Sequence, residues 1–462
     1  MGKAKYPKYK SSKTLWQEQI PSHWQETELR MLFADNKNKN IGLVERNLLS
    51  LSYGKLKRKD IDNATGLVPA SFEGYQIIDK GYIVLRFTDL QNDKKSLRVG
   101  YANEKGIITN AYIGLAPKTD IHSKYFYYQL HFLDKIKYFY NLGGGVRQSL
   151  VFKEFGRETI LVPDKEEQIK IVSFLDFKLS KIERFISKKK SLIKLLIEQK
   201  AGIINDAVTG KMGDELLGVS DKRLGISDKL TTKNSPLTTK SSGIEWLGDI
   251  PEHWEVRKLK YVADLQSGEM ITSEAISQEG EYPVFGGGGF RGYTNNYTND
   301  GYYVLIGRQG ALCGNIKYAN GKFWASEHSI VTYPKIEIET IYLGEILTVC
   351  NLGKLSQTAA QPGIAIGQLK NVYIPLPPLS EQQQIVSHIK TETATINKTI
   401  ATIEKEIALV EEYKTALIAE AVTGKIDVRD YEIPENIAEE TFEELEEDIE
   451  LNEEYDDNPT NK

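Results

Sequence analysis

Residues 166–211 read EEQIKIVSFLDFKLSKIERFISKKKSLIKLLIEQKAGIINDAVTGK, and residues 380–425 read SEQQQIVSHIKTETATINKTIATIEKEIALVEEYKTALIAEAVTGK. The two stretches share Glu-Gln-x-x-Ile-Val-Ser near their start and Ala-Val-Thr-Gly-Lys at their end, both at an offset of 214 positions. Ordered matches at a fixed offset do not arise by chance. The chain is therefore an internal duplication, which constrains the fold more strongly than any local pattern.

The segments that precede the two stretches are duplicated as well. Residues 10–24 contain Lys-Ser-Ser, Trp and Ile-Pro-x-His-Trp, and the same pattern returns at residues 240–254, at an offset of 230. The copies thus share a head and a tail, whereas their middles differ in sequence and the second copy is 16 residues shorter. We expect the head tryptophans to be packing anchors. We expect His23 and His253 to be structural, because no acidic or serine partner is repeated near them in the sequence.

Each tail has the pattern of a long helix with a heptad seam. Apolar residues recur at alternating steps of three and four. Both tails end in Thr-Gly, and a glycine at this position is typical of the C-terminal end of a helix. We predict that the seams of the two tails pair with each other, in preference to packing on their own domains. The predicted pairing residues are Val172, Leu175, Leu179, Ile182, Ile186, Ile193, Leu196 and Ile203 in the first tail, and Val386, Ile389, Ile396, Ile400, Ile403, Ile407, Val410 and Leu417 in the second.

Two lysines on the seam favour an antiparallel pairing. Lys200 and Lys414 occupy equivalent positions, so a parallel pair would set like charges against each other inside the coil. In the antiparallel register Lys200 is expected beside Thr393, and Lys414 beside Leu179. About 36 seam residues would span about 54 Å, with one middle domain expected at each end and an approximate two-fold axis between them.

Composition limits the classes of function. The net charge of −5 conceals an acidic C-terminus: residues 427–462 hold 16 acidic and two basic residues, which leaves a net charge of +9 on residues 1–426. A mildly basic body is compatible with a polyanion partner. Two cysteines permit neither a disulfide framework nor a four-cysteine zinc site, and indicate a reducing compartment. A basic N-terminus without an apolar stretch, and the lack of an 18-residue apolar run, predict no signal peptide or membrane span, hence a cytoplasmic protein.

Several motifs together resemble the specificity subunit of type I restriction–modification systems, over residues 10–426. The second copy carries WLGDIPEHWE at 246–255, FGGGGFRG at 285–292, LIGRQG at 305–310 and PLPPLSEQQQI at 375–385, and the first carries NLLSLSYG at 47–54, GIIT at 106–109 and GGVRQS at 144–149. Each motif alone is weak, but the ordered and repeated set is specific.

The resemblance implies an α/β (α+β) protein in which two mixed recognition domains are joined by two long antiparallel coiled-coil helices with an internal pseudo-two-fold. The expected boundaries are 1–164 and 240–378 for the recognition domains, 165–211 and 379–425 for the helices, 212–239 for a linker, and 426–462 for an acidic, disordered tail. Short β-like runs between glycine turns in both middles agree with a mixed fold.

The resemblance also implies a DNA reader without catalytic activity. Each domain would read one half of an asymmetric bipartite site in double-stranded DNA, and the helices would set the gap, at most about 16 base pairs for a 54 Å rod. Two methyltransferase subunits would bring S-adenosylmethionine, and motor–nuclease subunits would bring ATP and Mg²⁺. This chain would hold no cofactor or metal, since it has neither a phosphate-binding loop nor metal-ligand spacing.

Candidate DNA contacts lie on the glycine-rich turns and in one basic run. In the second domain the GxGxxG of residues 287–292 lacks the following helix that a dinucleotide needs, so we favour a DNA loop over a cofactor site. Arginine can read guanine and glutamine adenine, whereas lysines contact phosphates. The candidates are Tyr53, Lys55, Lys57, Arg58, Lys59, Arg147 and Gln148 in the first domain, and Arg291, Tyr293, Asn295, Asn296, Arg308 and Gln309 in the second.

Two simpler interpretations stay open. The glycine turns can be purely structural, and the basic run can be an ordinary solvated surface. At the level of the whole chain, one alternative is the recognition half of a fused restriction–modification enzyme, which the lack of catalytic motifs disfavours. Another is a duplicated coiled-coil scaffold that binds protein and not DNA, which the basic body and the Arg- and Asn-containing loops disfavour.

Overall fold

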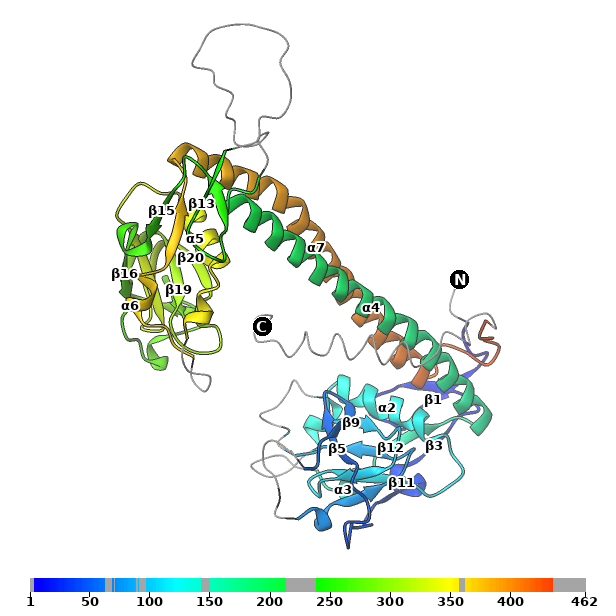
Figure 1. Ribbon diagram of the computed structural model, residues 1–462. Helices are drawn as coiled ribbons and strands as arrows, with labels where there is room; N and C mark the ends of the chain where they lie inside the picture. Colours follow the sequence, from blue (N-terminus) through cyan, green and yellow to red (C-terminus); the bar gives the residue numbers. More distant parts are fainter. Residues whose placement is uncertain are drawn as a thin grey trace, which may run out of the picture. The chain divides into compact units, whose positions relative to one another are not determined.

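The computed structural model describes residues 4–62, 69, 71–88, 90, 97–142, 150–212, 238–356 and 362–434. These residues form two compact units, one of residues 4–187 with 405–434 and one of residues 188–404. Each unit contains one mixed α/β domain and part of each of two long helices (Figure 1). The predicted fold class is confirmed.

The domain of the first unit is built from two small sheets. One has the strand order β6-β5-β10-β7 and the other β4-β11-β8-β9. Their strands are β4 (Phe33–Asp35), β5 (Leu48–Ser52), β6 (Lys55–Lys59), β7 (Gln76–Ile78), β8 (Ile83–Leu85), β9 (Val99–Tyr101), β10 (Gly106–Ile108) and β11 (Ile113–Pro117). The helices are α1 (Leu29–Leu32), α2 (Ser123–Lys135) and α3 (Phe152–Phe155). Helix α2 contributes Tyr125, Phe126, Leu130 and Leu133 to the core.

The domain of the second unit has one six-stranded sheet in the order β16-β21-β19-β20-β17-β18. Its strands are β16 (Ala263–Ser267), β17 (Tyr282–Gly286), β18 (Gly289–Thr294), β19 (Asn299–Gly307), β20 (Ile316–Ala325) and β21 (Ser329–Pro334). Helices α5 (Thr340–Val349) and α6 (Ile366–Leu369) follow the sheet in the chain. The unlike sheets of the two domains explain why the two middles do not align in sequence.

The duplicated segments form the same frame in both units. Each head is a two-stranded hairpin, β1 (Tyr9–Ser11) with β2 (Gln19–Pro21) in the first unit and β13 (Thr239–Ser241) with β14 (Asp249–Pro251) in the second. The next strand pairs antiparallel with the strand that precedes the long helix, as β3 (Gln25–Glu28) with β12 (Thr159–Val162) and as β15 (Glu255–Lys258) with β22 (Tyr373–Leu376). Each domain is therefore inserted between two strands of a common frame.

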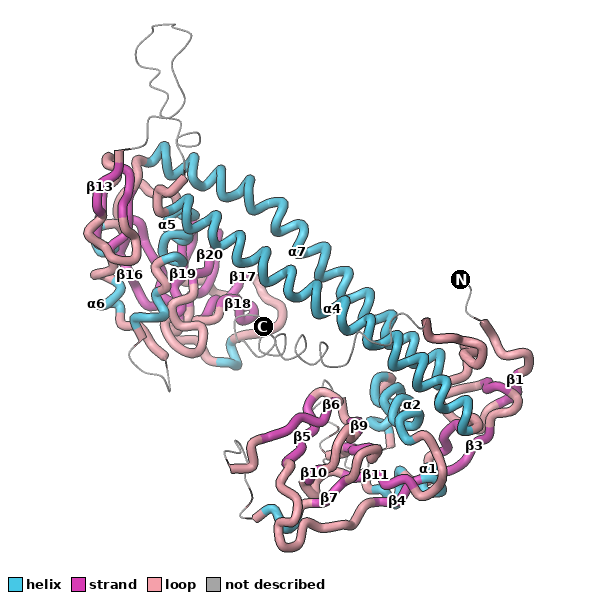
Figure 2. Tube along the Cα trace, turned by 45° about the vertical axis from the view of Figure 1, so that its right-hand side comes forward, coloured by secondary structure: helices cyan, strands magenta, loops and turns pink. Residues whose placement is uncertain are grey.

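The two tails are long helices that pair antiparallel, as predicted. Helices α4 (Lys165–Val208) and α7 (Leu379–Val422) have 44 residues each and lie side by side in Figures 1 and 2. In the first unit Leu175 near the start of α4 shares a core with Leu417 near the end of α7. In the second unit Ala207 at the end of α4 shares a core with Val386 near the start of α7. All the predicted pairing residues are buried or half-buried.

The seam lysines take different partners from those predicted. The Lys200 ammonium donates to the Asn397 side-chain oxygen at 2.9 Å, one turn away from the expected Thr393. The Lys414 ammonium donates to the Glu183 carboxylate at 2.6 Å, one turn beyond the expected Leu179. A long side chain can reach one helical turn to a polar acceptor, and its charge is then better solvated than beside apolar neighbours.

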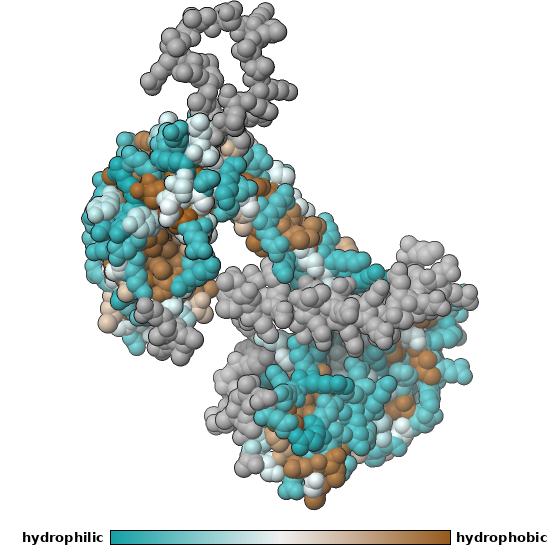
Figure 3. All heavy atoms as spheres, in the orientation of Figure 1, coloured by the Kyte–Doolittle hydropathy of each residue, from teal (hydrophilic) through white to brown (hydrophobic). Residues whose placement is uncertain are grey.

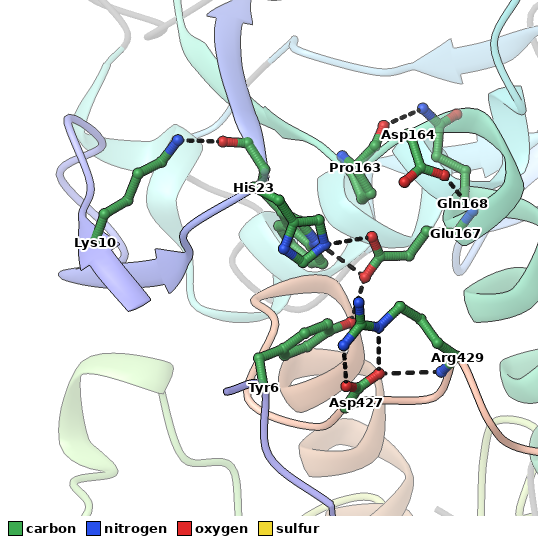
Figure 4. A network of polar contacts seen from close by, with 10 residues as sticks. Tyr6, Lys10, His23, Pro163, Asp164, Glu167, Gln168, Asp427 and Arg429 are labelled. Carbon is green, nitrogen blue, oxygen red and sulfur yellow. Dashed lines mark hydrogen bonds and ion pairs between the residues drawn. The ribbon is translucent and has the colours of Figure 1, made fainter. Parts of the chain in front are cut away.

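A carboxylate in the first turn of each long helix holds the head of its own copy. Glu167 is 2% exposed and accepts hydrogen bonds from the Tyr6 hydroxyl at 2.6 Å, the Trp24 indole N–H at 3.0 Å and the His23 Nε2 at 2.8 Å (Figure 4). Glu381 likewise accepts from Trp254 at 2.8 Å and from His253 at 2.6 Å. We expected no repeated acidic partner for the two histidines near them in the sequence. Each has one in the fold, Glu167 for His23 and Glu381 for His253, more than 120 positions further along the chain.

The glutamine that follows this glutamate in each copy, Gln168 or Gln382, has a separate structural role. The Gln168 amide donates to the Pro163 carbonyl and accepts from the His122 backbone N–H at the start of α2, both at 2.9 Å. Gln382 makes the same bonds in the second unit, to the Pro377 carbonyl at 2.9 Å and from the Glu339 N–H at the start of α5, at 3.0 Å. Each glutamine therefore ties a long helix to the first turn of a domain helix, where the N–H groups lack helical partners.

The predicted domain boundaries need one change at the C-terminal end. Ile426 and Val428 are 5% and 3% exposed, and Tyr431 packs edge-on against Phe174 of α4 at 4.8 Å between ring centres. The segment after α7 is thus packed for several residues beyond 425, because its apolar side chains cover the start of α4. Most of the predicted linker, at 213–237, and the remainder of the tail, at 435–462, lie outside the described residues.

His131 on α2 is enclosed without a hydrogen bond for its Nδ1 among the described residues. Burial, followed by the positive charges of Lys135 and Lys414, lowers the pKa of His131 to about 4. Burial also lowers the pKa of His122, at the start of the same helix. The folded first unit therefore favours neutral histidine at this surface of α2.

We expect the first unit to lose stability as the pH falls from about 6.5 toward 4. A folded pKa below the unfolded value of about 6.5 means that the unfolded chain binds the proton more tightly, so acid favours unfolding. With allowance for partial exposure, the loss assigned to His131 is about 2 kcal/mol. Amide hydrogen exchange of α2 across this pH range measures it. The His131→Phe variant keeps an aromatic ring without the titration and should show a shallower slope, whereas an unchanged slope would contradict the assignment.

Candidate nucleic-acid interface

The basic run of the first domain forms an edge strand. The turn at Tyr53, which has a positive φ of 46° and is 71% exposed, joins β5 to β6. Side chains alternate along a strand, so Lys55, Lys57 and Lys59 share one face of β6, which is the outer strand of its sheet. This row of ammonium groups can contact phosphates, and it also discourages edge-to-edge association with another sheet.

Arg58 does not belong to that row. Its guanidinium points to the other face of the strand, where Nε donates to the Glu104 carboxylate at 2.7 Å and Nη2 makes a second bond to the same group. The hydrogen bond from Arg58 lowers the pKa of Glu104. The positive charge predicted for a phosphate contact is therefore largely neutralised within the domain, because a bidentate arginine–carboxylate pair satisfies both groups.

A buried arginine that no sequence motif singles out stabilises this domain. Arg98 is fully buried, and its guanidinium donates to the Thr88 carbonyl at 2.7 Å and to the Tyr140 hydroxyl at 3.2 Å. Charged residues are rarely buried unless paired in this way. The other two candidates in this domain, Arg147 and Gln148, lie outside the described residues.

In the second domain the glycine-rich turn has a structural cause. The β17–β18 hairpin closes between Gly286 and Gly289, which pair across it. A Cβ at Gly287 would lie 2.8 Å from the Gln309 carbonyl oxygen and 3.0 Å from that of His328. Only glycine permits this approach of three backbone segments, so the turn brings together residues that are far apart in the sequence.

These segments surround an open hollow of about 600 Å³. It is lined by Gly287, Gly288, Arg291, Gln309, Gly310, His328, Pro362 and Gly363. Two of the predicted candidates, Arg291 and Gln309, thus meet at one site. His328 was not predicted, because a single histidine outside any motif carries no signal in the sequence.

The remaining candidates of the second domain do not line the hollow. Arg308, which we predicted as a base reader, donates from Nη1 to the Ser267 hydroxyl at 2.9 Å, and this bond ties the turn to strand β16. Tyr293 is held in β18 by two backbone hydrogen bonds of 2.9 Å with Ser277. Asn295 and Asn296 are exposed just beyond β18.

Comparison with known proteins agrees with this arrangement. The family model of the type I restriction modification DNA specificity domain matches residues 58–195 and 251–409, which together make up more than half of the chain. The chain belongs to this family. The two matches of the specificity domain fall on the two copies of the repeat.

Curated relatives of the specificity-domain family match parts of the chain. The EcoprrI type I restriction enzyme specificity subunit of Escherichia coli is 34% identical over 155 residues, which is 32% of this chain and 38% of that protein. The EcoDI specificity subunit of the same species is 26% identical over 182 residues, 39% of this chain and 40% of that protein. Each match spans about two fifths of the relative's length.

A solved structure has the same fold over most of the chain. It comes from work on complex assembly and conformational transition of the type I R-M system, and it covers 88% of this chain and 99% of its own at a TM-score of 0.54 and 15% identity. Within the described residues, no helix is long and apolar enough to cross a membrane, and no group of acidic, histidine or cysteine side chains is placed to hold a metal ion.

Proposed function

We propose that the chain is the DNA-recognition subunit of a type I restriction–modification complex, and that it reads an asymmetric bipartite site with one domain per half-site. The observation that carries the proposal is the pair of unlike domains inserted into one duplicated frame. Identical readers would select a symmetric site, and unlike readers select two different half-sites. The net charge of +9 on residues 1–426 supports a polyanion as ligand.

The long helices are proposed to set the gap between the half-sites and to dock two methyltransferase subunits. Their outer faces carry exposed apolar side chains, of which Leu195 on α4 and Leu409 on α7 are 61% and 65% exposed. Figure 3 shows such brown patches among the polar residues of the helices. Apolar surface of this kind is typical of a protein–protein interface.

Catalysis is proposed to belong to the partners. The methyltransferase subunits would bind S-adenosylmethionine, and motor–nuclease subunits would bind ATP and Mg²⁺, in the cytoplasm. This chain would supply only the recognition of DNA.

Methylome sequencing tests the proposal directly. A host that expresses this chain with its methyltransferase partner should carry methylated adenines in one bipartite motif with unlike halves, and a host that expresses the partner alone should lack them. In vitro, the affinity of the complex for DNA should fall at least about a hundredfold between 50 and 200 mM salt. A protein-binding scaffold would produce neither a motif that depends on this chain nor a salt-dependent affinity, and that result would reject the proposal.

A further inference from the structure

We infer that the hollow in the second domain is the base-reading site of that domain, with Gln309 as the reader and His328 as its positioning residue. The inference rests on the proposed function and assigns the ligand as a purine edge in duplex DNA. It also removes Arg308 from the set of readers.

The floor of the hollow is bare backbone. A Cβ at Gly310, where φ is +90°, would meet no atom within 4 Å, and Gly288 and Gly363 line the same site without side chains. A nucleobase can therefore approach the backbone closely, which is a common reason for glycine at a ligand site. The exposed side chains of Gln309 and Arg291 are then the first groups that a base pair contacts.

The turn that carries Gln309 is fixed on both sides. The Arg308 N–H donates to the His328 carbonyl at 2.8 Å, the Ile364 N–H donates to the Arg308 carbonyl at 3.0 Å, and the Gly310 N–H donates to the Pro362 carbonyl at 3.0 Å. With the inward bond of the Arg308 guanidinium to Ser267, the backbone of residues 308–310 cannot rotate freely. A rigid turn holds a reading side chain in the narrow range of geometry that base discrimination needs.

The amide of Gln309 is oriented by His328. The imidazole Nδ1 lies 2.9 Å from the Gln309 Oε1, and Nε2 lies 3.2 Å from a Glu327 carboxylate oxygen. When Nδ1 carries a proton it is the donor in this contact, because an amide oxygen only accepts. The Gln309 NH₂ group is thereby left to face a ligand, and it can donate to the N7 of a purine.

The remaining side chain of the hollow favours the same class of ligand. The stem of Arg291 lies against Gly286, where an added Cβ would be 2.5 Å from the Arg291 Cδ. The Arg291 guanidinium makes no hydrogen bond or ion pair with the described residues, so its donors are available to a base or a phosphate. No carboxylate is among the lining residues that the structure describes, which disfavours a cation as the ligand.

The test is a binding selection on the complete methyltransferase complex, with duplex DNA in which each position of the methylated motif is randomised in turn. We expect Gln309→Ala to lower discrimination about tenfold or more at one position of one half-site and to leave the other half-site unchanged. Gln309→Glu replaces a donor by an acceptor, so the preference at that position should move toward cytosine, whose N4 donates. Gln266→Glu, an exposed position on β16 with the same change of charge, should leave the motif unaltered.

His328 supplies the test of positioning. His328→Asn retains a nitrogen donor near the place of Nδ1 and should keep the wild-type preference, whereas His328→Leu should lose it to the same degree as Gln309→Ala. An unchanged motif in the Gln309 variants, or an equal loss of affinity for every sequence, would overturn the inference. If instead the wild-type complex shows no preference that depends on this chain, the proposed function itself fails.

Discussion

The Glu167→Ala variant should lose about 4 kcal/mol of stability in the first unit, because the hydroxyl of Tyr6, the indole of Trp24 and the imidazole of His23 lose the acceptor that they share. Tyr6 and Trp24 are 4% and 0% exposed, so water cannot replace the carboxylate once it is removed. Burial and then the hydrogen bond to Glu167 raise the pKa of Tyr6 well above its usual range, which reflects how closely the hydroxyl is enclosed. The loss should appear as faster hydrogen exchange in α2 and β12.

The duplication provides the matched control. Glu381 is 13% exposed and accepts from only His253 and Trp254 among the described residues, so Glu381→Ala should cost about half as much, and in the second unit. Glu167→Gln keeps an acceptor oxygen, so the stability of the first unit in this variant should lie between those of the wild type and Glu167→Ala. Equal losses in both units from either alanine variant would show that the carboxylate acts through the helix pair and not through its own head.

Replacement of Gly424 by alanine is expected to cost about 3 kcal/mol, again in the first unit. This glycine ends α7 with a positive φ of 70°, and an added Cβ would lie 2.4 Å from the Pro21 Cδ. The substitution therefore combines an unfavourable backbone conformation with a clash against the head of the first copy. Hydrogen exchange of the β1–β2 hairpin and of α2 measures the effect.

Gly248→Ala separates the two causes. Gly248 has the same φ of 70° but no atom within 4 Å of an added Cβ, so its substitution should cost only about 1 kcal/mol. Gly210→Ala would meet Pro251 at 2.4 Å and should destabilise the second unit instead. The end of each long helix thus affects the unit that contains the head of the other copy, because the two helices are antiparallel. Destabilisation of each copy's own domain would contradict that pairing.

The internal repeat was enough to predict much of the fold from the sequence alone. Matched heads and tails at fixed offsets predicted two equivalent frames, and the heptad seams predicted two long helices that pair with each other. The orientation followed from Lys200 and Lys414, because like charges avoid one another at an apolar seam. These features depend on local periodicity or on comparison of the chain with itself, so no knowledge of distant contacts was needed.

Tertiary structure alone decided which polar residues have partners. Arg58 belongs to a run of basic residues that looks like an ordinary solvated surface in the sequence, yet it binds Glu104, which lies 46 positions further along the chain. Arg308 and Gln309 are neighbours, but alternation along the backbone turns one inward to Ser267 and leaves the other beside His328. Such contacts depend on how separate segments meet in space, and residue type sets only which bonds are possible. For that reason the sequence could predict the kind of side chain at the interface, and only the fold could select among them.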